Sequence, residues 1–254
     1  MIISIEDIGM NFGGVAALSD VSFAVKTGHI KAIIGPNGAG KTTLFNLITG
    51  VYRPTTGNIL YGGVDIAGMS PDDIALRGVT RTFQNVELFS NMTVIENVMV
   101  GRHTRSRSGF LSCALRFPGM VREERQIRNS ARVHLDFVGL SARVGDMAPS
   151  LPLGHQRYLE IARALALEPK LLLLDEPAAG LDEKETEDLG ELIKRIRDRG
   201  ITILLVEHDM SLTMEISDEI VVLDYGKKIA EGTPREIQYN KKVIDAYLGG
   251  GTGA

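Results

Sequence analysis

The sequence has few of the features that mark secreted, membrane-spanning or nucleic-acid-coating proteins. Cys113 is the single cysteine in 254 residues, which excludes an intramolecular disulfide and fits a reducing compartment. No stretch of about 18 consecutive apolar residues is present, so no membrane-spanning helix is predicted. Residues 1–12 lack a basic start followed by a long apolar run, so no signal peptide is predicted. The formal net charge of −4 argues against nucleic acid as a partner.

What the chain does have is a composition suited to a large folded domain. Hydrophobic residues make up 44% and charged residues 24%, which allows a sizeable core. The length suits one domain or a domain with an inserted subdomain. Continuous apolar runs are typical of strands buried on both faces, as in a parallel sheet covered by helices. Such runs lie at residues 30–34, 171–174 and 201–206, and helical patterns at 41–49 and 183–199.

Alternating apolar residues near the N-terminus predict strands there, and the pair Gly62-Gly63 predicts a hairpin turn. Between residues 86 and 155 strand signals fade and helical ones replace them. Thr93 with Glu96 three residues later predicts a helix N-terminus. An arginine-rich segment follows, for which we favour a solvated face; proximity to anionic lipid is the alternative. Its arginines are Arg102, Arg105, Arg107, Arg116, Arg122, Arg125 and Arg128.

A glycine-rich loop follows the strand predicted at 30–34 and precedes a helix, which is the context that a phosphate-binding loop requires. Its glycines let successive backbone N–H groups point at phosphate oxygens, and the helix N-terminus adds partial positive charge. Lys41 is expected to reach the outer phosphates, and the Thr42 hydroxyl to bind Mg²⁺. The loop consists of Gly35, Pro36, Asn37, Gly38, Ala39, Gly40, Lys41, Thr42 and Thr43. The substrate is therefore expected to be a nucleoside triphosphate.

Two adjacent carboxylates follow the leucine run at 171–174. Asp175, at the end of a predicted strand beside the phosphate loop, would bind Mg²⁺ directly or through water. Glu176 would orient or deprotonate the attacking water. An exposed acidic turn is the alternative, and the phosphate loop makes it the weaker one.

Residues 151–157, with the sequence LPLGHQR, precede a helix predicted at 158–167. Here the chain resembles the ATP-binding cassette (ABC) transporter family over nearly all of its length. The resemblance implies an α/β fold: a phosphate-loop ATPase core (1–85 and 156–235) with an N-terminal antiparallel β-subdomain, an inserted helical subdomain (86–155) and a C-terminal tail (236–254). The family's usual signature is Leu-Ser-Gly-Gly-Gln, from which the chain departs at Pro152, Leu153 and His155. Gly154 keeps the backbone N–H that, by resemblance, contacts ATP held by the opposite subunit; a degraded contact is the alternative.

The resemblance also implies roles for isolated residues. Phe12 would stack on adenine, with core packing as the alternative. Gln84 would bind Mg²⁺ and sense the attacking water, and Asp182 would cross a dimer interface, while also being able to cap a helix. His208, after the strand predicted at 201–206, would donate to the γ-phosphate. The cofactors implied are ATP and Mg²⁺.

Residues 81–103 and 229–248 look like the ATPase subunits of branched-chain (hydrophobic) amino acid importers. That likeness implies a peripheral protein at the cytoplasmic face of the inner membrane. It also implies a homodimer or a heterodimer with a related ATPase, two membrane permease subunits and an extracytoplasmic solute-binding protein. Related systems for urea, amides or lipopolysaccharide are the alternatives, with a soluble non-transport ABC ATPase less favoured because the chain has one phosphate loop and no long heptad run.

Overall fold

The computed structural model describes residues 1–82, 87–103 and 118–249. The chain forms two compact units: Met1–Arg81 with Lys170–Ala254, and Thr82–Pro169. We call them the sheet unit and the helical unit. Gln84 lies outside the described residues, as do Arg105, Arg107 and Arg116. Within the described ranges, no helix combines the length and apolar character needed to cross a membrane.

The first sheet of the sheet unit is antiparallel and formed by the N-terminal segment. Its strand order is β2-β1-β4-β5, and residues of β1 pair with both β2 and β4. The predicted hairpin is confirmed, with Gly62 and Gly63 both at positive φ in the turn. The strands are β1 (Ile3–Phe12), β2 (Val15–Val25), β4 (Thr56–Tyr61) and β5 (Val64–Asp65).

The second sheet has six strands in the order β10-β9-β3-β8-β7-β6. All neighbours pair in parallel except β10, which runs antiparallel to β9. Every residue of β3, β7 and β8 is buried, as their continuous apolar runs predict. The strands are β3 (Ile30–Ile34), β6 (Val79–Arg81), β7 (Leu171–Asp175), β8 (Thr202–Val206), β9 (Glu219–Asp224) and β10 (Lys227–Gly232).

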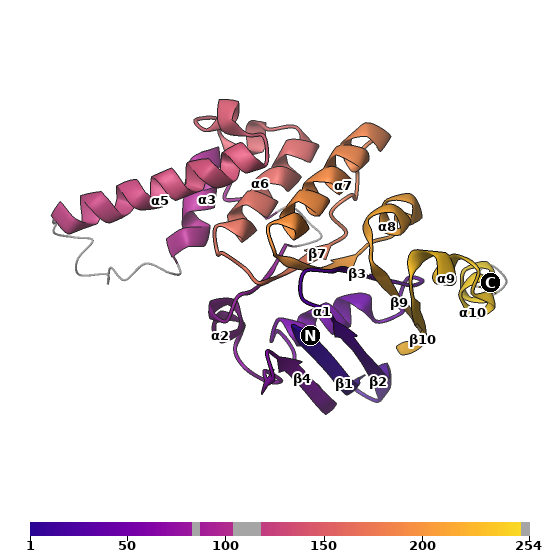
Figure 1. The fold of residues 1–254 in the computed structure, drawn as a ribbon. Helices are drawn as coiled ribbons and strands as arrows, with labels where there is room; N and C mark the ends of the chain where they lie inside the picture. Colours follow the sequence, from indigo (N-terminus) through magenta and orange to yellow (C-terminus); the bar gives the residue numbers. More distant parts are fainter. Residues whose placement is uncertain (83–86, 104–117, 250–254) are drawn as a thin grey trace. The chain divides into compact units, whose positions relative to one another are not determined.

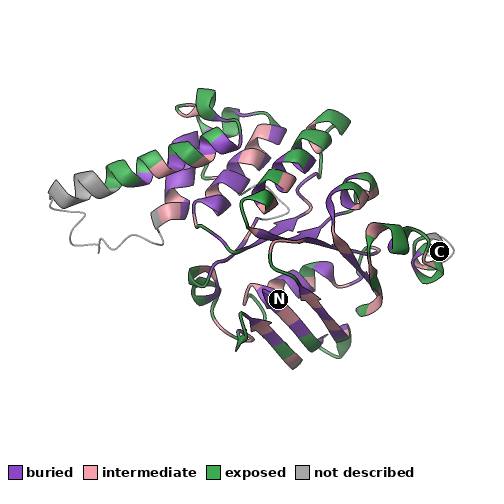
Figure 2. Cartoon of the chain, viewed as in Figure 1, coloured by how far each residue is buried: buried purple, intermediate pink, exposed green. Residues whose placement is uncertain are grey.

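Helices complete the sheet unit (Figure 1). Amphipathic α7 buries Leu189, Leu192, Ile193 and Ile196 and exposes charged residues, so buried and exposed positions alternate along it in Figure 2. The helices are α1 (Lys41–Ile48), α2 (Pro71–Leu76), α7 (Glu183–Asp198), α8 (Met210–Ile216), α9 (Pro234–Gln238) and α10 (Lys241–Gly249).

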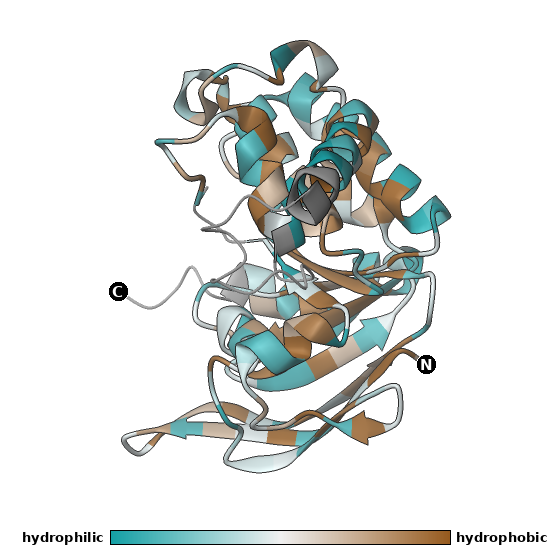
Figure 3. Ribbon diagram, turned by 90° about the vertical axis from the view of Figure 1, so that its left-hand side faces the viewer, coloured by the Kyte–Doolittle hydropathy of each residue, from teal (hydrophilic) through white to brown (hydrophobic). Residues whose placement is uncertain are grey.

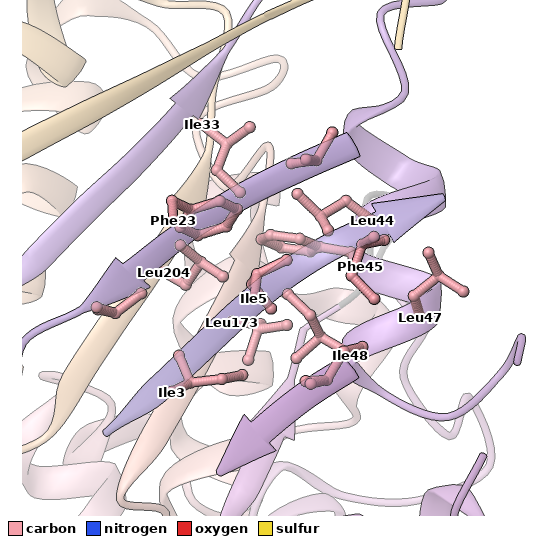
Figure 4. Packing of buried hydrophobic residues seen from close by; sticks show 14 of the residues in the cluster. Ile3, Ile5, Phe23, Ile33, Leu44, Phe45, Leu47, Ile48, Leu173 and Leu204 are labelled. Carbon is pink, nitrogen blue, oxygen red and sulfur yellow. The ribbon is translucent and has the colours of Figure 1, made fainter. Parts of the chain in front are cut away.

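One hydrophobic core joins the two sheets through α1. Leu44, Phe45 and Ile48 of that helix lie beside Ile5 of the antiparallel sheet and Leu173 of the parallel sheet (Figure 4). Because α1 directly follows the phosphate loop, burying its apolar side chains fixes the loop at the carboxyl end of β3.

The helical unit contains α3 (Val94–His103), α5 (Pro118–Phe137) and α6 (Leu153–Leu165), with short 3₁₀ turns at Ser141–Arg143 and Ala148–Ser150. The three helices contact one another. In Figure 3 the helices of the chain carry both hydrophobic and hydrophilic residues. At the start of α3, the Thr93 N–H and hydroxyl both donate to Glu96, at 2.8 and 2.7 Å, which confirms the predicted N-terminus.

The helical unit differs from the sequence prediction at its second boundary. The expected limit at residue 155 falls inside α6, which begins at Leu153 rather than at residue 158. Because α6 packs on α3 and α5, the whole helix belongs to this unit, which ends at Pro169. Gly101 of α3 lies so near α6 that a Cβ there would come within 2.4 Å of the Arg163 carbonyl oxygen.

Candidate nucleotide site

The phosphate loop leaves β3 and enters α1 with a backbone that depends on glycine. Gly40, the N-cap of α1, has φ 100°, a conformation that residues with a Cβ rarely adopt. A Cβ on Gly35 would approach the Leu223 carbonyl oxygen to 2.0 Å, so a side chain is excluded there as well. By contrast, a Cβ on Gly38 would have nothing within 4 Å. The loop therefore packs tightly at its ends and has open space at its centre.

Lys41 is buried at the first position of α1. Its Nζ donates to the carbonyl oxygens of Gly35, at 2.7 Å, and Pro36, at 3.0 Å. Burial lowers the pKa of Lys41, while the charges of Glu176 and Asp175 act in the opposite direction. The lysine ammonium thus lies inside the loop and within electrostatic reach of both carboxylates.

The acid pair and His208 come together because of the register between two parallel strands. Asp175, the last residue of β7, pairs with Val206, the last residue of β8. The chain beyond each strand therefore emerges at the same edge, which places Glu176 opposite the segment that carries His208. The Glu176 N–H extends the ladder by donating to the Val206 carbonyl at 2.8 Å.

Glu176 and His208 are in direct contact. The Glu176 Oε1 and His208 Nε2 atoms are 2.7 Å apart, with side-chain exposures of 15% and 42%. Glu176 also has φ 48°, which is uncommon for a residue with a Cβ. A carboxylate held against an imidazole beside a phosphate loop has the components for moving a proton near a phosphate.

Arg81 is a site residue that the sequence analysis did not identify. Its Nη2 contacts Asp175 Oδ2 at 2.6 Å and its Nη1 contacts Asn46 Oδ1 at 2.7 Å. The guanidinium also lies over the Phe45 ring, 5.5 Å from its centroid. Arg81 therefore ties the acid at the end of β7 to α1, which follows the phosphate loop. Its partners are distant in sequence, so no local pattern could have indicated it.

Glu207 is the second residue that the sequence analysis missed. It is 3% exposed and accepts hydrogen bonds from the backbone N–H groups of Ala178, His208 and Asp209. Burial raises the pKa of Glu207, and the three N–H groups act in the opposite direction. A buried acid at the end of an apolar strand was the available signal.

Two further predicted site residues are exposed on the sheet unit. Phe12 is 41% exposed and makes an edge-on contact with Tyr52, with ring centroids 5.3 Å apart. It therefore lies outside the core, contrary to the packing alternative. Asp182 is the N-cap of α7: its carboxylate accepts from the Glu185 N–H at 2.8 Å, and Glu185 accepts from the Asp182 N–H at 3.2 Å.

The signature segment of the helical unit is a helix start rather than a turn preceding a helix. Pro152 is the N-cap of α6 and provides no side-chain cap, and Gly154 lies buried in the first turn. The first N–H groups of any α-helix have no acceptor within that helix. Gly154 therefore presents its N–H at the positive end of the α6 dipole.

Residues 87–93 are fastened to the rest of the helical unit by three buried or half-buried polar side chains. The Asn97 side chain accepts from the Phe89 N–H and donates to the carbonyl oxygens of Phe89 and Thr93. Glu160 of α6 accepts from the Glu87 N–H, and Arg163 donates to the Glu87 carbonyl at 2.6 Å. Burial raises the pKa of Glu160.

The C-terminal helix α10 lies beside the phosphate loop. A cavity of about 560 Å³ is lined by Pro36 to Ala39 of the loop, by Asp224 at the end of β9 and Tyr225 after it, and by Asp245 and Ala246 of α10. Burial raises the pKa of the Tyr247 phenol, and a hydrogen bond with the Gly35 backbone opposes that rise. The start predicted for the tail, residue 236, falls inside α9. The tail includes α10, which contacts the phosphate loop.

These residues fit a nucleoside triphosphate bound with Mg²⁺. The open space at Gly38, the helix start and Lys41 suit phosphate oxygens. No group of three His, Cys, Asp or Glu side chains able to hold a metal occurs among the described residues. That is compatible with Mg²⁺, which is usually bound through one or two carboxylates together with substrate phosphates; here Asp175 and the exposed Thr42 hydroxyl are the available ligands.

Comparisons with known proteins identify the family of the chain. The ABC transporter family model matches residues 18–179, and the branched-chain amino acid ATP-binding cassette transporter model matches residues 227–252. The chain is 46% identical to the high-affinity branched-chain amino acid transport ATP-binding protein BraF of Pseudomonas aeruginosa, over 98% of each chain. It is 45% identical to the corresponding protein LivG of Escherichia coli, again over 98% of each.

Solved structures give the same result. A nucleotide-free ATP-binding cassette from an ABC transporter superposes with a TM-score of 0.86 at 32% identity, covering 97% of this chain and 98% of that one. A dimeric bacterial ABC transporter cassette superposes with a TM-score of 0.77 at 26% identity, covering 92% and 99%. The predicted fold class is confirmed, and the chain belongs to the ABC transporter family.

Proposed function

We propose that the chain is the ATP-hydrolysing subunit of an importer of branched-chain amino acids. The contact between Glu176 and His208 beside the phosphate loop carries the hydrolytic part of this proposal. The substrate class is supported by the relatives BraF and LivG, whose names describe high-affinity branched-chain amino acid transport. The match of the branched-chain cassette model to residues 227–252 supports the same class.

In the proposed reaction, ATP binds with its phosphates in the loop from Gly35 to Thr43 and its adenine against Phe12. The Lys41 ammonium turns from the loop carbonyls, which are its partners in this structure, toward the terminal phosphates. Mg²⁺ bound by Thr42, Asp175 and Gln84 would neutralise charge on the phosphate oxygens. Arg81 holds the Asp175 carboxylate at the end of β7.

Hydrolysis requires a proton to leave the attacking water. The Glu176 carboxylate accepts that proton while the water oxygen forms a bond to the γ-phosphorus. The bond between the γ-phosphorus and the bridging oxygen breaks, which leaves ADP and phosphate. With its proton at Nε2, His208 donates to Glu176 in this structure. When ATP is bound, this N–H would turn from Glu176 to the γ-phosphate oxygens and stabilise their negative charge.

The proposed assembly contains two nucleotide-binding chains, either two copies of this one or this one with a related ATPase. Gly154 at the start of α6 would contact the ATP held by the opposite chain, and Asp182 would cross the interface. A solved dimeric bacterial cassette of the family supports this arrangement. Two permease subunits, a solute-binding protein and a peripheral position at the cytoplasmic face of the membrane complete the proposal.

Transport in a reconstituted system tests the substrate class. The complete transporter is placed in proteoliposomes, with ATP supplied on the side of the membrane where this subunit lies. Uptake of labelled leucine, isoleucine and valine is then compared with uptake of urea. Uptake of the three amino acids that depends on ATP and on this chain is expected. Uptake of urea alone would contradict the substrate class.

The composite site is tested by Gly154→Asp, which places a carboxylate in the first turn of α6. In the proposed dimer this charge repels the opposite chain's ATP, so ATP-driven dimerisation and hydrolysis are both expected to be lost. Glu124→Gln, in α5 of the same unit, is a control change of charge on an exposed glutamate. Normal dimerisation of Gly154→Asp with ATP would refute the composite site.

A further inference from the structure

Glu207 is the first residue after β8, and its side chain links the two segments that carry the reactive side chains. One segment follows β7 and contains Glu176 and Ala178; the other follows β8 and contains His208 and Asp209. The carboxylate spans them, with Oε1 accepting from the Ala178 N–H at 2.7 Å and Oε2 accepting from the His208 N–H at 2.7 Å and the Asp209 N–H at 3.2 Å. Both oxygens are therefore in use, each on a different segment.

The segment after β7 needs such a support because its backbone is strained. Glu176 has φ 48°, and a conformation of that kind persists only where the surroundings hold it. Among the contacts of this turn, the Glu176 N–H donates to the Val206 carbonyl, the Ala179 N–H to the Glu176 carbonyl, and the Ala178 N–H to Glu207. In the third of these contacts, a side chain accepts from the turn's backbone.

We propose that Glu207 is a positioning residue for hydrolysis, which fixes the contact between Glu176 and His208 by joining the backbones of their two segments. The proposal rests on the proposed function, because it assigns Glu207 a part in placing the water-activating carboxylate. Glu207 itself touches no reacting atom. It acts through the backbone, since the turn at Ala178 sets where the Glu176 side chain points, and the His208 N–H sets where the imidazole begins.

Substitution with glutamine provides the most conservative test. Glutamine keeps the size and shape of Glu207 but has one acceptor oxygen and one NH₂ group. In either orientation the NH₂ group faces a backbone N–H of one segment, so one of the two attachments is lost. Glu207→Asp serves as a second variant, since it keeps the charge but is one methylene too short to reach both segments. Glu215→Gln, on the exposed surface of α8, is the matched control.

Two measurements on each variant decide the proposal. In the full chain, amide hydrogen exchange is expected to accelerate on the order of tenfold in the peptides covering residues 176–182 and 207–212, because a hydrogen bond to a charged group is lost. Strands β3, β7 and β8 are expected to keep their protection. In the assembled transporter, kcat is expected to fall on the order of tenfold while the dissociation constant for MgATP stays within about twofold.

The outcomes separate this proposal from the proposed function. Unchanged exchange in residues 176–182 in both variants would overturn the role of Glu207, and so would a uniform acceleration that includes β3 and β8, because that marks general loss of stability. A loss in affinity for MgATP equal to the loss in kcat would also overturn it. Failure of the unaltered transporter to hydrolyse ATP would refute the proposed function, while the exchange result would still decide whether Glu207 holds the two segments.

Discussion

The buried ion pair between Arg81 and Asp175 gives a quantitative prediction. Replacing Arg81 with methionine keeps apolar contact with Phe45 but removes the partner of a carboxylate whose side chain is 3% exposed. Two unit charges about 4 Å apart interact by roughly 4 kcal/mol at an effective dielectric constant of about 20. Leaving a buried charge without its partner typically costs about 3–5 kcal/mol. Arg81→Met is therefore expected to lower the free energy of unfolding by that amount.

A double-mutant cycle separates the unpaired charge from the lost packing. The variants are Arg81→Met, Asp175→Asn and the double variant, with Arg77→Met as an exposed control expected to stay within about 0.5 kcal/mol of the unaltered chain. Because the double variant has no buried charge left unpaired, its cost is expected to be about 3 kcal/mol less than the sum of the two single costs.

Urea unfolding followed by circular dichroism provides the measurement, since the chain contains no tryptophan for fluorescence. The thermal midpoint of Arg81→Met is also expected to fall by roughly 10 °C, because about 2–4 °C is lost per kcal/mol in a chain of this size. Costs that add within about 0.5 kcal/mol would show that the two charges are not coupled in the folded protein.

Three further predictions concern other parts of the sheet unit. Asp182→Ala and Thr233→Ala each remove a helix cap and should each lower the free energy of unfolding by about 1 kcal/mol. Only Asp182→Ala should also reduce ATP hydrolysis. Equal hydrolysis by the two variants would show that Asp182 has no role at the dimer interface. Hydrogen bonds from Lys26 and Lys31 lower the pKa of Glu219 to about 2, against its ordinary pKa of 4.5. The ionised Glu219 therefore stabilises the folded chain by about 1–2 kcal/mol after solvent screening, fully above pH 4.5 and progressively less as the pH falls toward 2. Urea unfolding of Glu219→Gln should depend less on pH over that interval, and an unchanged pH dependence would contradict the assignment. Tyr247→Phe should weaken MgATP binding about threefold in titration calorimetry, since one neutral hydrogen bond is worth roughly 0.7 kcal/mol. Tyr239→Phe, on the exposed surface, should leave the affinity unchanged. Equal affinities of the two variants would show that α10 does not support the phosphate loop.

Much of the fold could be predicted because the relevant signals are local. The runs that became β3, β7 and β8 are continuous and apolar, and a strand buried on both faces requires such a run. The phosphate loop was recognisable because its glycines are needed by the backbone itself, as the close approach of Gly35 to Leu223 illustrates. Asp175 and Glu176 were found by their position at the end of a strand that follows this loop.

The parts that could not be predicted depend on tertiary contacts. Arg81 contacts Asp175, and Glu207 contacts Ala178, across long separations in sequence. Each is a single polar residue with no repeating pattern around it, and the position of Glu207 after an apolar run was its one local signal. The start of α6 was placed too late because Pro152 supplies a helix N-cap position without the usual side-chain acceptor. The boundary of the helical unit was misplaced for the related reason that packing of α6 on α3 and α5, rather than local sequence, decides where that unit ends.

The contact between α10 and the phosphate loop likewise had no counterpart in the sequence. The tail was recognisable only as a segment resembling that of importer ATPases. Its helix brings Asp245 and Ala246 to the cavity beside the loop and Tyr247 to Gly35. These contacts give the segment a structural relation to the nucleotide site, which the Tyr247→Phe measurement tests.

In the proposed reaction, Glu176 activates water for ATP hydrolysis. Glu176→Gln keeps the shape of the side chain and a hydrogen bond to His208 but removes the basic oxygen that accepts the proton. In the assembled transporter, steady-state ATP hydrolysis is expected to fall at least about 100-fold, while MgATP still binds and the ATP-bound dimer accumulates. Hydrolysis by Glu176→Gln within twofold of the unaltered protein would show that Glu176 is not the base.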